Sequence, residues 1–333
     1  MTTATALWFR APRQVEPGPV ELAEPGPGEV LVRSVASGIS GGTELLAYRG
    51  ELPPDLALDE ALPALAGGRF TFPFRYGYSC VGRVAGSAAD LAEGSLVFAY
   101  HPHQDAFVVP SSSVVALDAG TDPRRATLFP LVETALQVSL DAGPVAHQPV
   151  AVLGLGAVGL LTAVLLGMSG AQVMAAEPRA WRREVAQRLG VETTTPAELP
   201  DLVATATGGD GVPLVVEASG DPATLPGALE LLAHEGTVLV ASWYGTKAAT
   251  LPLGGAFHRR RLSLRSTQVS TIPAVLSAQW TIRRRREVAH ALLARLPLEH
   301  VATHDFPFSE AASAFAAVDQ GQAGLVHAAL RYD

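Results

Sequence analysis

The sequence has few of the residues that build covalent or metal-based sites. Its 333 residues include one cysteine, Cys80, one lysine, Lys247, and no asparagine. A single cysteine excludes an intramolecular disulfide, a four-cysteine zinc knuckle and an iron–sulfur cluster built from this chain alone. The lack of asparagine excludes N-glycosylation. No glycine-rich phosphate loop precedes Lys247, which excludes a Walker-type nucleotide triphosphatase.

Charged residues make up only 17% of the chain, and the formal net charge is −8. This acidic balance argues against nucleic acid as a partner, because phosphate binding needs clustered positive charge. The arginine runs at 259–261 and 283–286 are local exceptions. We interpret both as a solvated turn or helix start, and the alternative is a dock for an anionic group.

The chain shows neither a secretory signal nor a clear membrane span. Its N-terminus lacks a basic leader followed by an apolar core. Residues 151–170 are uncharged over a length that could cross a bilayer, but glycines interrupt them and favour a strand, a turn and a helix. We therefore expect a soluble, cytoplasmic protein of about two domains with no membrane partner.

The first third of the chain is β-rich by pattern. Residues 20–39 alternate around Pro-Gly turns and predict a hairpin, and the EPGP repeats at 16–19 and 24–27 are interpreted as turns. Short strands punctuated by glycine and proline, at 80–86, 94–100 and 105–110, predict an antiparallel barrel-like or sandwich-like domain.

From about residue 124 the apolar spacing becomes helical, and four apolar strands then alternate with helices. The strands are expected at 149–153, 171–177, 213–220 and 237–242. Short connections between strand and helix predict an α/β domain with a doubly wound parallel sheet. Residues 261–269 could add a last strand, and the tail from 304 could rejoin the first domain or extend the second.

The strongest motif is GLGAVG, which follows an apolar strand and opens a helix. In this context it predicts a dinucleotide-binding turn. Gly154 permits the tight turn, Gly156 lets the backbone approach a pyrophosphate, and Gly159 allows close packing of helix on strand. Ala157 and Val158 begin the helix, whose N-terminus offers N–H groups to the phosphates.

Glu177 lies at the end of the second strand, 18 residues after Gly159. An acid there binds the ribose 2′-hydroxyl and repels a 2′-phosphate, which favours NAD over NADP. Arg179, with Arg182 and Arg183 nearby, is the counter-signal, because arginine here can hold a 2′-phosphate. NADP therefore stays open, and a simple exposed helical turn is the other interpretation of these arginines.

Further candidate cofactor contacts follow the later strands. Ser219 and Gly220 end the strand expected at 213–220, and Ser242 ends the strand expected at 237–242, where ligands of open α/β sheets bind. Trp243 and Tyr244 come next and could face a nicotinamide or an apolar substrate, or could simply pack a loop.

Four segments in this order resemble the medium-chain dehydrogenase/reductase superfamily, the zinc alcohol dehydrogenase group in the broad sense. They are residues 21–44, 76–86, 130–143 and 150–163. The resemblance covers nearly the whole chain. It implies a GroES-like catalytic domain at 1–125 and 271–333, a Rossmann domain at 126–270, and a homodimer paired through 261–269. SGISGGTE and GY further resemble the branch that contains bacteriochlorophyllide a dehydrogenase.

The chain departs from the zinc-dependent members of this superfamily at their ligand positions. The resemblance aligns Ser40 with a ligand cysteine, residues 77–79 with Gly-His-Glu, and Phe129 or Pro130 with a third ligand. Leu45 stands where some members have a proton-relaying histidine, and the four-cysteine zinc lobe is missing. Because such sites use thiolate and imidazole ligands, we expect no bound zinc.

Without zinc, hydrogen-bond donors or a general acid must stabilise negative charge on a substrate oxygen. The resemblance puts Tyr78 near the reacting centre, with Ser40 and Thr43 as secondary donors; core filling and turn roles are the alternatives. His101 and His103 follow a strand whose family counterpart borders the substrate pocket, and histidine can donate a proton. We select Tyr78, His103 and Ser40 as catalytic candidates. A metal role for the histidine pair lacks a third ligand.

Three further positions have simpler interpretations. Thr134 falls where the family has a threonine that contacts the nicotinamide. Glu133 beside it could be a base or a proton relay. Helix neighbours point about 100° apart, so both cannot face the cofactor, and we favour Thr134 as the contact. Glu133 is then expected to be a solvated helix acid. Cys80 is expected to be a small buried hydrophobe.

Together these features predict a zinc-independent, NAD-dependent oxidoreductase. It would transfer hydride between nicotinamide and a secondary alcohol or ketone of an apolar or bulky organic substrate, the bulk being suggested by Trp243 and Tyr244. Two alternatives remain open. One is an NADPH-dependent enoyl or quinone reductase, the usual chemistry of zinc-free members, and the other is a dinucleotide-binding protein that has lost catalysis.

Overall fold

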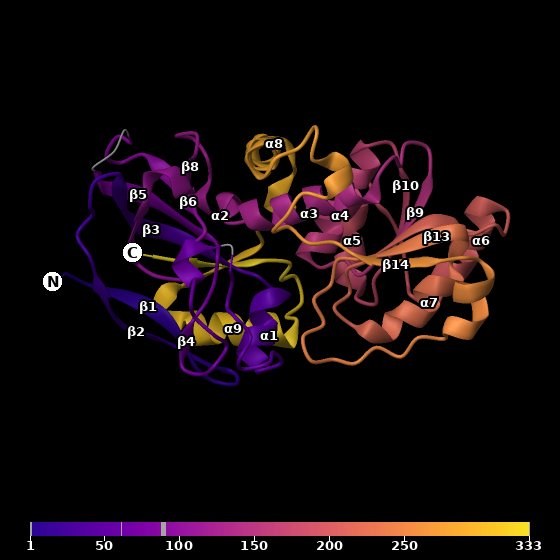
Figure 1. The fold of residues 1–333 in the computed structure, drawn as a ribbon, viewed down its shortest axis with the longest axis horizontal. Helices are drawn as coiled ribbons and strands as arrows, with labels where there is room; N and C mark the ends of the chain where they lie inside the picture. The colour runs from indigo at the N-terminus through magenta and orange to yellow at the C-terminus, as the bar shows by residue number, and fades with distance from the viewer. Residues whose placement is uncertain (1, 61, 88–90, 333) are drawn as a thin grey trace. The chain divides into compact units, whose positions relative to one another are not determined.

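The computed structural model describes residues 2–60, 62–87 and 91–332, which form two compact units. One unit comprises Met1–Pro130 with His290–Asp333, and the other comprises Leu131–Ala289. Both limits lie later in the chain than the expected domain boundaries. The difference is larger at the second limit because most of helix α8 (Ile282–Arg295) belongs to the second unit (Figure 1).

Two sheets build the first unit. The smaller has the order β2-β1-β4, with strands β1 (Thr2–Ala11), β2 (Gln14–Leu22) and β4 (Phe74–Arg75). The larger has the order β15-β16-β3-β5-β6-β8, and β7 also pairs with β3. Its strands are β3 (Glu29–Ile39), β5 (Cys80–Ser87), β6 (Leu96–Ala99), β7 (Ala106–Pro110), β8 (Val114–Ala116), β15 (His304–Pro307) and β16 (Ala328–Arg331). The GroES-like, β-rich fold is therefore confirmed.

The C-terminal tail rejoins the first unit, as the family resemblance implied. Strand β16 pairs antiparallel with β3, and β15 pairs parallel with β16. Between them lies helix α9 (Ala311–Gln320). Phe315 of α9 meets Phe9 of β1 edge to face, with ring centroids 5.4 Å apart. This aromatic contact joins the two ends of the chain in one core, which also contains most of helix α1 (Thr43–Arg49).

The predicted hairpin at 20–39 is wrong. Strand β2 pairs with β1, whereas β3 pairs with β5, β7 and β16. The segment between β2 and β3 thus passes from one sheet to the other. Residues 16–19 also lie inside β2 and not in a turn. Their prolines are tolerated because β2 is an edge strand, where a missing N–H interrupts no second ladder.

The second unit is a doubly wound α/β domain, as predicted. Its six parallel strands have the order β11-β10-β9-β12-β13-β14. They are β9 (Pro149–Leu153), β10 (Gln172–Ala176), β11 (Glu192–Thr194), β12 (Val212–Glu217), β13 (Leu232–Val240) and β14 (Ser263–Ser266). From β9, the strands up to β11 extend the sheet to one side and the strands from β12 onward extend it to the other. Dinucleotides bind at the switch point between two such neighbouring strands.

Helices connect these strands and cover the sheet. They are α4 (Ala157–Met168), α5 (Ala180–Arg188), α6 (Leu199–Thr207) and α7 (Leu225–Glu230). Figure 1 shows α4 and α7 on opposite sides of the sheet. Strand β13 begins at Leu232, earlier than the expected start at residue 237, and α7 ends just before it at Glu230. No described helix is long and apolar enough to cross a membrane; the uncharged run is β9, a turn and α4.

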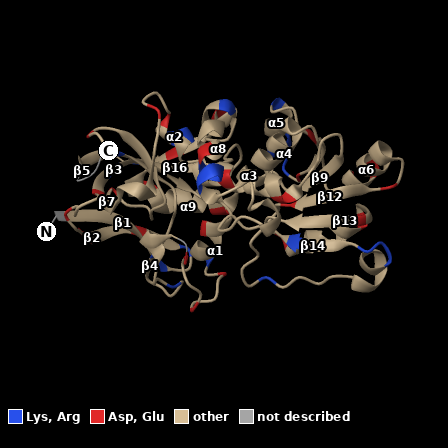
Figure 2. Ribbon diagram, turned by 45° about the horizontal axis from the view of Figure 1, so that its top comes forward, with Lys and Arg blue, Asp and Glu red and all other residues tan. Residues whose placement is uncertain are grey.

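A buried arginine corrects two of our expectations. Arg285, near the start of α8, is only 1% exposed, and its Nη2 lies 2.9 Å from Glu133 Oε1. Its Nη1 also donates to Gln137 on helix α3 (Phe129–Ala142). The run at 283–286 is therefore not solvated throughout, although Figure 2 shows it as basic. Glu133 is likewise a buried partner of arginine and not a solvated helix acid.

Candidate functional site

The glycine-rich turn of the second unit uses its three motif glycines differently. Gly154 has φ +90°, and a Cβ there would lie 2.6 Å from Ser219 Cα. A Cβ on Gly159 would lie 2.1 Å from the carbonyl oxygen of Gly154. A Cβ on Gly156 would meet nothing within 4 Å. Packing thus requires the first and third glycines, whereas Gly156 borders open space of the kind that a pyrophosphate needs.

Helix α4 begins directly after this turn. Gly156 is its N-cap and supplies no side-chain hydrogen bond, and Ala157 and Val158 form its first turn. The first N–H groups of a helix have no partner within the helix and favour anions. The residues present therefore fit the diphosphate of a dinucleotide.

Glu177 connects the glycine-rich turn to the end of β10. The side chain is 2% exposed. Its Oε2 accepts a hydrogen bond from Leu155 N at 3.0 Å, and its Oε1 accepts one from Arg179 N, also at 3.0 Å. A carboxylate has about four acceptor positions, and these two backbone hydrogen bonds use two of them. The position that we predicted for ribose recognition thus also fixes the turn itself.

The neighbouring arginines divide into two kinds. Arg182 Nη1 lies 3.6 Å from Glu177 Oε2, and Arg183 Nη1 donates to the Glu177 carbonyl oxygen at 2.7 Å. The side chain of Arg179 is exposed. Two of the three arginines therefore bind the end of β10, and only Arg179 presents an exposed guanidinium.

A buried carboxylate organises the carboxyl ends of β12 and β13. Glu217 is fully buried; it accepts hydrogen bonds from Ser219 N at 2.7 Å and from the hydroxyl of Tyr244. Burial and Glu217 both raise the pKa of Tyr244. Ser242 Oγ accepts from Gly220 N at 2.9 Å. The hydroxyl of Tyr244 thus binds Glu217. Glu217 was not among the residues predicted from the sequence.

Trp243 and Thr134 complete the predicted residues of this unit. Trp243 is 42% exposed, so its indole is open to contact. Thr134 lies on α3 beside Glu133 and is half-buried. Ser219 is exposed and Ser242 is half-buried. Three predicted cofactor positions of this unit are buried, namely Gly154, Gly159 and Glu177. The other predicted positions keep some exposed surface.

In the first unit, His103 is the centre of a buried hydrogen-bonded chain. The side chain has no exposed surface. Its Nε2 lies 2.7 Å from Glu44 Oε2, and its Nδ1 lies 2.7 Å from Ser37 Oγ. Ser37 Oγ in turn lies 2.8 Å from the hydroxyl of Tyr332. Both imidazole nitrogens are therefore engaged, and the chain runs from β3 to the C-terminal residues.

Glu44 continues this chain toward two of the predicted catalytic residues. It lies in the first turn of α1, and its Oε1 accepts a hydrogen bond from Ser40 N at 2.9 Å. On the other side, the imidazole of His103 packs on Gly77: a Cβ there would lie 2.8 Å from His103 Cδ2. His103 and Glu44 thus join the segment of Ser40 to the segment that precedes Tyr78.

Tyr78 is half-buried, and its hydroxyl interacts with the hydroxyls of Ser40 and Thr43. Burial, followed by the charge of Glu44, raises the pKa of Tyr78 to about 12, while the two hydroxyls oppose the increase. Tyr78 therefore remains protonated at neutral pH and can donate a hydrogen bond. The structure brings together Tyr78, Ser40 and Thr43, as the sequence suggested, but it attaches His103 to them only through Glu44.

His101 has different surroundings. Its ring stacks on Phe107 with centroids 4.0 Å apart, and its Nδ1 lies 2.9 Å from the Pro102 carbonyl oxygen. Burial lowers the pKa of His101 to about 4. It is therefore a neutral core histidine.

The residues at the family's zinc-ligand positions do not fit zinc. Ser40 and Tyr78 carry hydroxyls, and Ser79 Oγ donates to the Thr127 carbonyl oxygen at 2.6 Å. The neighbouring Cys80 is buried, with Sγ 3.3 Å from the carbonyl oxygens of His101 and Pro102, and burial raises its pKa. Within the described part of the chain, no group of three or more His, Cys, Asp or Glu side chains could hold a metal ion.

Comparison with known proteins agrees with this organisation. The family model for zinc-binding dehydrogenases matches residues 157–281. The chain is 27% identical to 2-desacetyl-2-hydroxyethyl bacteriochlorophyllide A dehydrogenase of Cereibacter sphaeroides, over 94% of this chain and 93% of that protein. It is 28% identical to L-threonine 3-dehydrogenase of Bacillus velezensis over 66% of this chain, but spans only 61% of that relative.

The fold is shared with solved structures of low sequence identity. An oxidoreductase/dehydrogenase of unknown specificity from Escherichia coli has a TM-score of 0.82 at 16% identity, with both chains fully covered. At this identity the likeness concerns the fold alone. The bacteriochlorophyllide dehydrogenase relative agrees with the resemblance of the SGISGGTE segment.

Proposed function

The chain belongs to the medium-chain dehydrogenase/reductase superfamily, and on this premise we propose that it is an NAD-dependent, zinc-independent oxidoreductase. The proposed reaction interconverts a secondary alcohol and a ketone. The observation that carries the proposal is the Tyr78 hydroxyl, which stays protonated at neutral pH and stands, like Ser40, at a position where the zinc-dependent members have a metal ligand.

The cofactor preference rests on Glu177. Its buried carboxylate, fixed by Leu155 N and Arg179 N, faces a bound ribose with acceptors only. Acceptors suit a 2′-hydroxyl and repel a 2′-phosphate, which supports NAD. Thr134, Ser219 and Ser242 are the further side chains that we assign to cofactor contact.

When bound, NAD supplies or accepts the hydride. The chain must then stabilise the charge that develops on the substrate oxygen. We assign this task to Tyr78, which can donate a hydrogen bond to an oxyanion, with Ser40 beside it. Because the pKa of Tyr78 is about 12, its hydroxyl carries its proton at neutral pH and is available as a hydrogen-bond donor.

His103 and Glu44 hold this donor in place. Glu44 fixes the backbone of Ser40, and His103 packs on Gly77 next to Tyr78. With both ring nitrogens engaged, His103 has no free group for a substrate. We therefore propose that it is a positioning residue for Tyr78 and Ser40 and not the proton donor itself.

The substrate class is proposed to be apolar or bulky. Tyr78 packs against the apolar core cluster of the first unit, and Trp243 of the second unit leaves much of its indole exposed. Each ring by itself offers aromatic surface of the kind that packs against apolar groups. A polar polyol would leave such surfaces without complementary partners.

The proposal is tested with purified protein of measured metal content. Oxidation of NADH is followed with a panel of ketones, enones and quinones, and stereolabelled NADH reports hydride transfer to product. We expect ketone reduction that survives chelation. Stoichiometric zinc with loss of activity on chelation would contradict the zinc-free donor. Exclusive reduction of enones or quinones would support the alkene or quinone alternative instead.

A further inference from the structure

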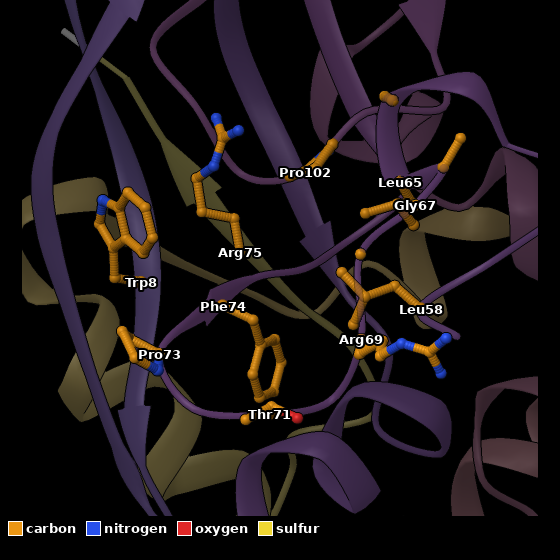
Figure 3. A pocket seen from close by; sticks show the side chains of 13 residues that line it. Trp8, Leu58, Leu65, Gly67, Arg69, Thr71, Pro73, Phe74, Arg75 and Pro102 are labelled. Atoms are coloured by element: carbon orange, nitrogen blue, oxygen red, sulfur yellow. The ribbon is translucent and has the colours of Figure 1, made fainter. Parts of the chain in front are cut away.

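The first unit contains a pocket that uses none of the residues assigned above. Its volume is about 490 Å³, which is the size of a small-molecule site. Figure 3 shows Trp8 of β1 and Arg75 of β4 on one side, Leu58 and Arg69 on the other, and Phe74 between them. Ser37, Ser40, Glu44, Tyr78 and His103 are not among its lining residues. The pocket is thus separate from the polar chain around His103.

The charge of the pocket is opposite to that of the protein. Two of its described lining residues, Arg69 and Arg75, are charged, and both are basic. The whole chain carries a formal net charge of −8. The remaining lining side chains are largely apolar and include Trp8, Leu58 and Phe74. The lining therefore complements a molecule that has one negative group and an apolar body.

Arg75 has an open hydrogen-bonding edge. Its guanidinium carbon lies 5.5 Å from the ring centroid of Trp8, and its Nη1 donates to Gln104 Oε1 at 3.1 Å. In the described structure no acidic side chain pairs with Arg75, and its Nε and Nη2 have no hydrogen-bond acceptor. These two groups are also not among the buried polar atoms without a partner, so solvent reaches them.

The geometry of this edge selects the ligand. Nε–H and Nη2–H point in parallel from one side of a planar guanidinium, which matches the two oxygens of a carboxylate. The Trp8 ring lies under Arg75 and also under Arg10, whose guanidinium carbon is 5.1 Å from the ring centroid. Partial burial lowers the pKa of Arg75, because the charged form is incompletely solvated. A bound anion would compensate this loss of hydration.

We propose that this pocket binds an organic carboxylate, whose apolar body lies against Trp8 and Leu58 and whose two oxygens accept from Arg75. The site lies beyond the proposed hydride transfer and does not depend on it. Arg75 ends β4, three residues before Tyr78 in the sequence, so an occupant can act on the segment that carries the donor.

Isothermal titration calorimetry of the full chain tests the site with phenylacetate, its neutral analogue phenylacetamide, and inorganic phosphate. We expect saturable binding of phenylacetate and about tenfold weaker binding of the amide, because the charge-assisted pair is lost. Phosphate should also bind more weakly, since it lacks the apolar body. Absence of saturable phenylacetate binding at millimolar concentration, or equal affinity for the amide or phosphate, would overturn the proposal.

Variants locate the binding. Arg75→Met should weaken phenylacetate binding about tenfold, and Arg75→Lys should also weaken it, because lysine lacks the planar fork. Arg83→Met is the matched control: Arg83 is exposed on β5 and lies outside the pocket. Unchanged affinity in both Arg75 variants would refute the site. Titration of the wild type with NADH separates the two proposals. If the wild type bound phenylacetate but not NADH, the proposed function would fail and the carboxylate site would stand.

Discussion

His103 Nε2 lies 2.7 Å from Glu44 Oε2, and neither side chain has any exposed surface. Breaking a buried pair by removing one partner is costly, because the other partner stays buried without compensation. We therefore expect His103→Ala to lower the free energy of unfolding by about 3 kcal/mol or more in urea titrations. Arg10→Ala, which breaks the exposed Arg10–Glu16 pair, should cost less than about 1 kcal/mol. Equal costs would show that the buried pair is not stabilising.

Removal of the Tyr78 hydroxyl should impair catalysis without loss of cofactor binding. A single donor to a developing oxyanion contributes about 10²-fold or more to the rate. We expect Tyr78→Phe to lower kcat for ketone reduction by about this factor, with an unchanged Kd for NADH. Tyr76→Phe is the control, since its ring lies 6.2 Å from that of Tyr78 and the same group is removed. A Tyr78→Phe variant with wild-type kcat would refute the donor role.

The sequence predicted the second unit well because its signals are local. The strand, the turn at Gly154 and the helix α4 are contiguous, and Glu177 follows at the expected distance. The hairpin error has the opposite cause. The alternating pattern of β3 does not specify which strand it pairs with. Its partners β16 and β7 lie far away in the sequence. Turn residues alone could not show that the segment at 23–28 changes sheets.

The chain around His103 could not have been predicted in the same way. Ser37, Glu44, His103 and Tyr332 belong to separate segments, and the pairing of β16 with β3 brings the last one close. No periodicity reports such a tertiary contact. Arg285 is a similar case, because a run of four arginines at a helix start has the pattern of a solvated surface. Its burial depends on Glu133 and Gln137 of another helix.

The two kinds of glycine in the dinucleotide turn should respond differently to alanine. A Cβ on Gly156 meets nothing within 4 Å, so Gly156→Ala should leave the melting temperature nearly unchanged but weaken NADH binding in fluorescence titrations. A Cβ on Gly159 lies 2.1 Å from the Gly154 carbonyl oxygen, so Gly159→Ala should lower the melting temperature. NADH binding by Gly156→Ala at wild-type affinity would contradict the proposed phosphate position.

Glu177 should set the preference between the two nicotinamide cofactors. We expect Glu177→Ala to weaken NADH binding about tenfold and to weaken NADPH binding less, since the repulsion of a 2′-phosphate is relieved. Glu184→Ala is the control, because Glu184 is an exposed acid on helix α5, which follows Glu177 in the chain. Fluorescence titration with both cofactors measures the ratio. If Glu177→Ala kept the wild-type ratio, the carboxylate would serve only to fix the turn.

Two buried histidines should make the protein sensitive to acid. Burial lowers the pKa of His327 and of His101 to about 4, against 6.5 for the free side chain. The unfolded chain therefore binds more protons than the folded one between these values, so stability is full above about pH 6.5 and falls as the pH decreases toward 4. Each histidine can contribute up to about 3 kcal/mol to this loss. In urea titrations across this range, His327→Leu should reduce the slope, whereas His258→Gln, at an exposed position, should not. An unchanged slope in His327→Leu would show that His327 is charged or solvated in the folded state.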